Sequence, residues 1–152
     1  MNLIDIKSPA DLKGLSIAEL TDLTAQARQA LMTKVSEHGG HFGPPMGAAE
    51  MIMALHYVFN SPIDKIVYDV SHQSYVHKMV TGRALAFLDH DHYDDVTGYT
   101  DPTESEHDFF NIGHTSTSIS LASGLATARN LKGDSENIIA IIGDGSLSGG
   151  EA

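Results

Sequence analysis

One segment constrains the fold of this chain more than any other. Residues Asn137–Ile142 form an almost wholly apolar run that leads directly into Gly143-Asp144-Gly145. Such a run predicts a buried strand, and apolar side chains on both of its faces are typical of a central strand in a parallel sheet. Helical patterns alternate with apolar runs along the rest of the chain. Together they predict an α/β fold, a parallel sheet flanked by helices.

The spacing of apolar residues predicts the other elements. The first helix opens at Ser16, which stands three residues before Glu19 as in a capping box, and it ends before Gly39-Gly40. Residues 87–110 show no periodicity and are expected to form a long surface connection. The remaining expected elements are a helix from Met46 to about Phe59, a strand over 65–70, a helix over 73–80 and a helix from Ile119 to Gly133.

The composition is that of an ordinary globular domain and excludes several kinds of partner. Twenty acidic and nine basic residues give a formal charge of −11, which disfavours binding to nucleic acid or to anionic membranes. The chain has no cysteine, so no disulfide or thiolate site is possible. The first residues lack the pattern of a secretory signal, and no apolar stretch approaches the length of a membrane span. A cytoplasmic location is expected.

The turn Gly143-Asp144-Gly145 is the strongest candidate for a site. It would lie at the carboxyl end of the predicted strand, where open α/β sheets bind ligands. Flanking glycines let the backbone approach a ligand closely, and one carboxylate suits Mg²⁺ that also binds phosphate oxygens. The alternative is a structural turn in which Asp144 caps a helix. The glycine spacing matches neither a dinucleotide fingerprint nor a nucleophile elbow, and no phosphate-loop lysine is present.

A second candidate is the polar segment Gly113-His114-Thr115-Ser116-Thr117-Ser118, directly before the helix expected from Ile119. The amino terminus of a helix offers free N–H groups and the positive end of the helix dipole, which favour an anion such as a diphosphate. The alternative is ordinary capping of the helix by one serine or threonine.

Two further histidines stand in turns. His41 follows Gly39-Gly40, and His72 follows the strand expected over 65–70. A single histidine in such a place is usually a packed or capping residue. If His41, His72 and His114 meet in one pocket, their imidazoles could act as base, acid and phosphate partner.

The run Asp89–Asp95 contains four aspartates and two histidines. Its spacing fits no standard set of metal ligands, so we expect a solvated acidic loop.

Taken in order, these segments resemble the amino-terminal domain of the 1-deoxyxylulose-5-phosphate synthase family, among the transketolase-like enzymes that use thiamine diphosphate. The resemblance runs from about residue 34 onward and depends on the order and spacing of several motifs. The motifs that carry it are Gly40-His41-Phe42, Asp69-Val70-Ser71-His72-Gln73, His77-Lys78 with Thr81-Gly82-Arg83, Gly113 to Ser118, and Gly143-Asp144-Gly145.

This resemblance implies that residues 1–152 are the amino-terminal, incomplete part of a thiamine-diphosphate-binding domain. It implies condensation of pyruvate with glyceraldehyde 3-phosphate to 1-deoxy-D-xylulose 5-phosphate, by a homodimer. Asp144 would be a ligand of Mg²⁺, and His41 would reach the substrate and assist proton transfers. The residues implied to lie near the cofactor are His72, Gly113, His114, Thr115, Gly145 and Ser146.

Several features depart from the family pattern. Phe42–Gly47 is more similar to transketolase, and Ser71 stands where the family usually has glycine. Residues 87–103 are acidic, whereas the family typically has basic residues there. These departures keep open a transketolase component that transfers a ketol unit between sugar phosphates.

The family's second metal ligand, an asparagine, and the glutamate that activates the cofactor would both follow Ala152. The 152 residues alone are therefore expected to be inactive, either as a fragment or as one component of a split enzyme. A non-catalytic module that only binds a partner is the alternative from a different class.

Overall fold

The computed structural model describes all 152 residues, which form two compact units. Unit 1 comprises residues 1–60 and 73–98 and is helical. Unit 2 comprises residues 61–72 and 99–152 and contains both strands.

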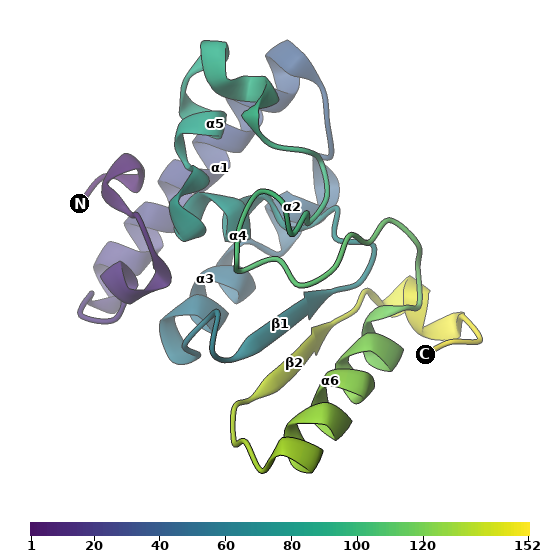
Figure 1. The fold of residues 1–152 in the computed structure, drawn as a ribbon. Helices are drawn as coiled ribbons and strands as arrows, with labels where there is room; N and C mark the ends of the chain where they lie inside the picture. Colours follow the sequence, from purple (N-terminus) through teal and green to yellow (C-terminus); the bar gives the residue numbers. More distant parts are fainter. The chain divides into compact units, whose positions relative to one another are not determined.

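The main element of unit 1 is helix α1, Ile17–His38 (Figure 1). The predicted capping box is confirmed: the Glu19 N–H donates to Ser16 Oγ at 3.3 Å, and the Ser16 N–H donates to the Glu19 carboxylate at 2.8 Å. The helix ends at Gly39, whose φ of 82° takes the chain out of the helix. The buried apolar face consists of Leu20, Leu23, Ala27, Ala30 and Leu31.

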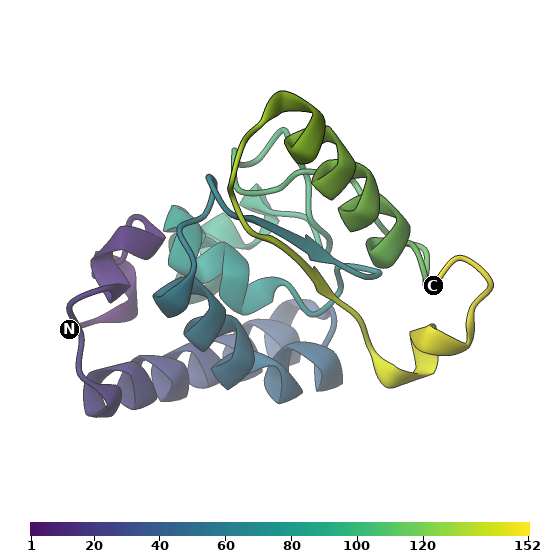
Figure 2. The same ribbon diagram turned by 90° about the horizontal axis from the view of Figure 1, so that it is seen from below.

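Shorter helices complete unit 1. Helix α1 packs against α3 and α5, and α3 packs against α4. Figure 2 shows α3 lying along α1. The bounds are η1 Leu3–Asp5, η2 Pro9–Leu12, α2 Gly43–Gly47, α3 Ala49–Val58, α4 Tyr75–Lys78, the π-helical η3 Met79–Arg83, α5 Leu85–Leu88 and η4 His90–Asp95.

The helix predicted from Met46 to Phe59 is two helices in the structure. Helix α2 begins at Gly43, because proline is tolerated in a first turn, where its missing N–H is not needed. The chain leaves helical geometry at Ala48, with φ −94° and ψ 0°, and α3 starts at the next residue. The predicted boundary was therefore wrong at its amino end.

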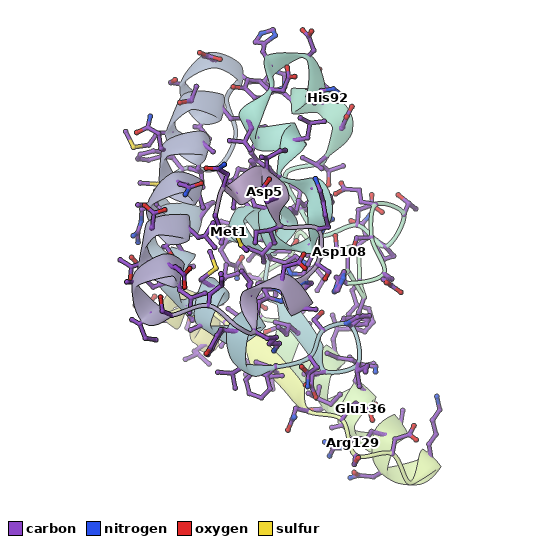
Figure 3. All side chains as sticks on the ribbon, turned by 90° about the vertical axis from the view of Figure 1, so that its left-hand side faces the viewer. Met1, Asp5, His92, Asp108, Arg129 and Glu136 are labelled. Atoms are coloured by element: carbon purple, nitrogen blue, oxygen red, sulfur yellow. The ribbon has the colours of Figure 1, made fainter.

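The acidic loop is more regular than expected. Residues 87–110 include the end of α5 and all of η4, whose Tyr93 is buried. The aspartates pair with histidines: His92 Nδ1 lies 2.7 Å from Asp95 and His38 Nε2 lies 2.9 Å from Asp94. Figure 3 labels His92 on this segment.

Unit 2 contains strands β1, Lys65–Tyr68, and β2, Ile138–Ile141, which pair in parallel as predicted. The register aligns Lys65 with Ile138 and Tyr68 with Ile141. Helix α6, Ser118–Lys132, packs against both strands and ends at Gly133 in the left-handed conformation. The core of unit 2 contains Val67, Ile112 and Ala122, with Phe110, Leu121, Leu125 and Ile138 packed around them.

One expectation for the strands needs correction. Strand β1 ends at Tyr68 and not at residue 70, because Val70 and Ser71 have φ of 58° and 67°. Within these 152 residues strand β2 pairs only with β1, and Ala140 is exposed, so its central position in a sheet stays a prediction. The loop between α6 and β2 is held by Arg129, which donates to the Glu136 carbonyl at 2.9 Å; Figure 3 labels both residues.

Candidate functional site

Asp69 is the residue that organises the carboxyl edge of the sheet in unit 2. It directly follows β1, and only 1% of its surface is exposed. Its carboxylate accepts three backbone N–H groups, those of Ser116 at 3.0 Å, Thr117 at 2.8 Å and Ser118 at 2.9 Å. These amides form the amino terminus of α6, so Asp69 ties the end of β1 to the start of this helix.

The electrostatics of Asp69 follow from its donors. Burial alone would raise the pKa of this carboxyl. The hydrogen bonds from the Ser118 and Ser116 amides, the Ser146 side chain and the Thr117 amide outweigh burial, and they hold the pKa below its ordinary value. The carboxylate is therefore ionised at neutral pH, and it compensates the positive end of the α6 dipole.

This arrangement limits one sequence argument. The amino terminus of α6 was expected to offer free N–H groups to a diphosphate. The N–H groups of Ser116, Thr117 and Ser118 instead bind Asp69. A diphosphate at this turn would use other amides, and its binding here stays a prediction. Sequence reasoning missed this role for Asp69, although an acid directly after a buried strand was the available signal.

The two predicted cofactor segments do lie together. Ser116 Oγ donates to the Ser146 carbonyl at 2.6 Å, which connects the turn before α6 to η5, Asp144–Ser148. The contact is close enough to require glycine at position 149, because an added Cβ would lie 1.8 Å from Ser116 Oγ. Gly113–Thr115 and Gly145–Ser146 therefore belong to one region at the carboxyl edge of the sheet.

Asp144 begins η5 and does not cap it. The cap position is Gly143, and no side-chain hydrogen bond caps the helix. Asp144 is exposed, and a Cβ added at Gly143 or Gly145 would meet no atom within 4 Å. The carboxylate and the flanking backbone are thus open to a ligand, in contrast to the buried carboxylate of Asp69.

His114 lies on the same edge beside a cavity of about 330 Å³. Its ring is exposed, and Nδ1 lies 2.7 Å from the Thr115 carbonyl oxygen, which orients the imidazole. The cavity is lined by Asn111, Ile112, Gly113, His114, Thr117, Ser120, Leu121 and Glu151.

His72 follows two residues whose backbone has a conformation that residues other than glycine rarely adopt. Val70 and Ser71 both have positive φ. Ser71 is fully buried; its hydroxyl donates to the Ile112 carbonyl at 2.6 Å and accepts the Thr100 N–H at 3.0 Å. This turn leaves His72 half-buried at the end of β1. The positive φ also explains why glycine would fit at position 71.

His41 belongs to unit 1, whereas His72 and His114 belong to unit 2. Their convergence on one pocket stays a prediction. In unit 1, His41 is half-buried and lines a cavity of about 220 Å³.

The residues at the carboxyl edge of unit 2 supply some, but not all, of the groups that would bind Mg²⁺ and a diphosphate. No group of three or more histidine, aspartate or glutamate side chains is placed to hold a metal ion. Asp144 can supply one carboxylate, and Mg²⁺ commonly takes one or two carboxylates with phosphate oxygens and water. The open backbone around Gly143 and Gly145 leaves room for such a ligand.

A parallel sheet with an open carboxylate and a polar helix turn at its carboxyl edge defines an α/β unit, and this edge is where open α/β sheets bind their ligands. The comparisons with known proteins identify the family. The sequence pattern of the 1-deoxy-D-xylulose-5-phosphate synthase family matches residues 3–152, so the chain belongs to this family, as its amino-terminal part.

Individual relatives agree with this assignment. The chain is 53% identical over 150 residues to 1-deoxy-D-xylulose-5-phosphate synthase of Caldanaerobacter subterraneus subsp. tengcongensis. It is 52% identical to the protein of that name from Shouchella clausii and 51% identical to that from Symbiobacterium thermophilum, each over 152 residues. The matches cover 99% or 100% of this chain but 24% of each relative.

Proposed function

We propose that the chain forms part of a thiamine-diphosphate-dependent enzyme that condenses pyruvate with glyceraldehyde 3-phosphate to 1-deoxy-D-xylulose 5-phosphate. Membership of the family supports this activity. The observation that carries the proposal is the open Asp144 carboxylate at the end of β2, beside the Gly113–Thr115 turn that Ser116 joins to Ser146. Since the chain spans about a quarter of its relatives, the rest of the enzyme is required.

In this proposal, Asp144 binds Mg²⁺ and the backbone at Gly145 and Ser146 approaches the diphosphate. His72 and the Gly113–Thr115 turn contribute further contacts to the cofactor. When bound, thiamine diphosphate supplies the carbon nucleophile of the reaction. His41 of unit 1 donates and accepts protons at the substrate oxygens, a role that an imidazole side chain commonly takes in enzymes.

The two other functions are less well supported. Transfer of a ketol unit between sugar phosphates would suit a transketolase, but the relatives found here carry the synthase name. A module that binds a partner without catalysis would not require an exposed carboxylate between two open glycines.

The activity can be tested in a chimera. This chain replaces the corresponding 150 residues of the Caldanaerobacter synthase, to which it is 53% identical. The chimera is expected to form 1-deoxy-D-xylulose 5-phosphate from pyruvate and glyceraldehyde 3-phosphate. A chimera that folds with a cooperative thermal transition but forms no product would contradict the proposal. Product from xylulose 5-phosphate and ribose 5-phosphate instead would favour the transketolase.

Cofactor binding gives a second test. Calorimetric titration of the chimera with thiamine diphosphate should show binding that depends on Mg²⁺. Asp144→Asn should weaken it by at least about tenfold, because a neutral amide is a poorer magnesium ligand. Asp134→Asn, which removes the same charge from an exposed position in unit 2, is the matched control. Equal binding by both variants would show that Asp144 is not a ligand of Mg²⁺.

The remaining features of the proposal concern assembly and location. We propose a homodimer that acts in the cytoplasm. None of the helices in the structure has both the length and the apolar character required to span a bilayer. Sedimentation analysis of the chimera tests the dimer.

A further inference from the structure

Unit 1 places a tyrosine directly against His41. The His41 backbone N–H donates to the Tyr75 hydroxyl oxygen at 3.2 Å. The two rings lie 6.1 Å apart, centroid to centroid, at 47°. Tyr75 is 4% exposed, and its ring packs on Phe87 at 5.3 Å, so its hydroxyl is held in place from the opposite side.

Two glycines allow this approach. Gly40 has a φ of 121°, and a Cβ at this position would lie 2.8 Å from the Tyr75 hydroxyl oxygen. At Gly98, an added Cβ would lie 3.4 Å from both that oxygen and His41 Nε2. The hydroxyl and the imidazole thus occupy space that side chains at positions 40 and 98 would fill. Tyr75, His41, Gly40 and Gly98 are therefore closely packed against one another.

The same short helix also fixes the loop on the other side of His41. Lys78 stands one turn after Tyr75 in α4 and is fully buried. Its Nζ donates to the Thr97 carbonyl at 2.9 Å and lies 3.4 Å from Thr97 Oγ1. Because Gly98 follows Thr97, helix α4 holds the 97–98 segment through Lys78 and the 40–41 turn through Tyr75.

These contacts border the cavity of about 220 Å³ that His41 lines, together with Tyr75, Thr97 and Gly98. A histidine that exchanges protons with a substrate must keep its ring nitrogens in a fixed orientation toward that substrate. A backbone hydrogen bond to a rigid tyrosine restricts the turn from which the His41 side chain projects.

We propose that Tyr75 is a positioning residue for His41: its hydroxyl fixes the backbone of the 40–41 turn and thereby the imidazole at the cavity. This inference rests on the proposed role of His41 in proton transfer. Tyr75 itself is not assigned any contact with substrate or cofactor.

The test uses Tyr75→Phe, which keeps the ring packed on Phe87 and removes only the hydroxyl. In the 152-residue chain, hydrogen exchange of the His41 amide measured by NMR should become at least about tenfold faster, because its acceptor is lost. In the chimera, kcat should fall about tenfold while KM changes less than twofold. Tyr57→Phe in α3 is the matched control and should change neither quantity.

A double-mutant cycle separates positioning from a general structural effect. In a His41→Gln background, Tyr75→Phe should cause no further loss of kcat, because the tyrosine acts through the histidine. Equal losses in both backgrounds, or unchanged amide exchange in Tyr75→Phe, would overturn the inference. If His41→Gln retains full kcat, the proposed role of His41 fails, whereas a loss in His41→Gln without a loss in Tyr75→Phe refutes the positioning role alone.

Discussion

At the scale of single residues, the two carboxylates at the carboxyl edge of unit 2 differ in environment. Asp69 is buried and accepts hydrogen bonds from three backbone amides, whereas Asp144 is exposed between two open glycines. The Asp69 carboxylate is already hydrogen-bonded within the protein. Of these two carboxylates, only that of Asp144 is open to an external ligand. The same side-chain type thus serves structure at one position and, in our proposal, binding at the other.

We expect Asp69→Asn to lower the free energy of unfolding at pH 7 by about 2 to 3 kcal/mol, because a buried, ionised acceptor is lost. The folded-state pKa of Asp69 is lowered, so its contribution is present above the ordinary carboxyl pKa of 3.8. It is lost as pH falls through the lower pKa of the folded state. Urea unfolding of both proteins at several pH values measures this difference. A difference that stays constant down to pH 2 would contradict the assignment.

Ser71 permits a paired prediction. Ser71→Ala loses both hydrogen bonds of the hydroxyl and keeps a side chain at positive φ, so it should cost about 2 kcal/mol. Ser71→Gly loses the same bonds but adopts the positive φ without strain, and it should be about 1 kcal/mol more stable than Ser71→Ala. Denaturant titration of the two variants gives this comparison directly. If alanine proves as stable as glycine here, the backbone is not strained at this position.

At the scale of elements, the helix ends followed from local signals. The capping box at Ser16, the glycine after α1 and the left-handed Gly133 after α6 all act within one turn of the chain. The start of α2 was misplaced, since proline is compatible with a first turn as well as with the residues before a helix.

Ser16→Ala should destabilise unit 1 by about 1 kcal/mol, because the Glu19 N–H loses its acceptor at the start of α1. Thermal unfolding followed by circular dichroism measures the change. Ser36→Ala, in the exposed last turn of the same helix, makes the same substitution without removing a cap and should shift the transition little. Equal effects at the two ends would show that the cap contributes nothing specific.

At the scale of the whole molecule, the two-stranded sheet leaves one edge of β2 without a neighbouring strand. This strand is apolar, with the sequence Ile-Ile-Ala-Ile, and Ala140 on it is exposed. An unpaired apolar edge is a surface on which further strands or other chains can add.

The isolated chain is therefore expected to self-associate with increasing concentration, and Ala140→Lys should reduce this association. A lysine on an edge strand opposes pairing through its charge. Sedimentation velocity over a range of concentrations provides the measurement. Ala128→Lys, at an exposed position of α6, carries the same substitution as a control. If both lysine variants associate like the parent chain, the contact lies elsewhere.

The sequence by itself was sufficient to predict the parallel α/β class, the residues that cap α1 and α6, and the family. These depend on local spacing and on the order of motifs, which a chain carries without being folded. It also indicated which segments would form the carboxyl edge, and the structure confirms that Ser116 and Ser146 join two of them.

Only the tertiary structure decided which partner each polar group takes. Asp69 binds amides 47 to 49 residues away, and Tyr75 binds an amide 34 residues before it. The amino terminus of α6 has the same local sequence whether a diphosphate or a carboxylate of the protein binds it. The choice depends on which group the fold brings within hydrogen-bonding distance, and that distance is set by the packing of strands and helices that are far apart in the chain.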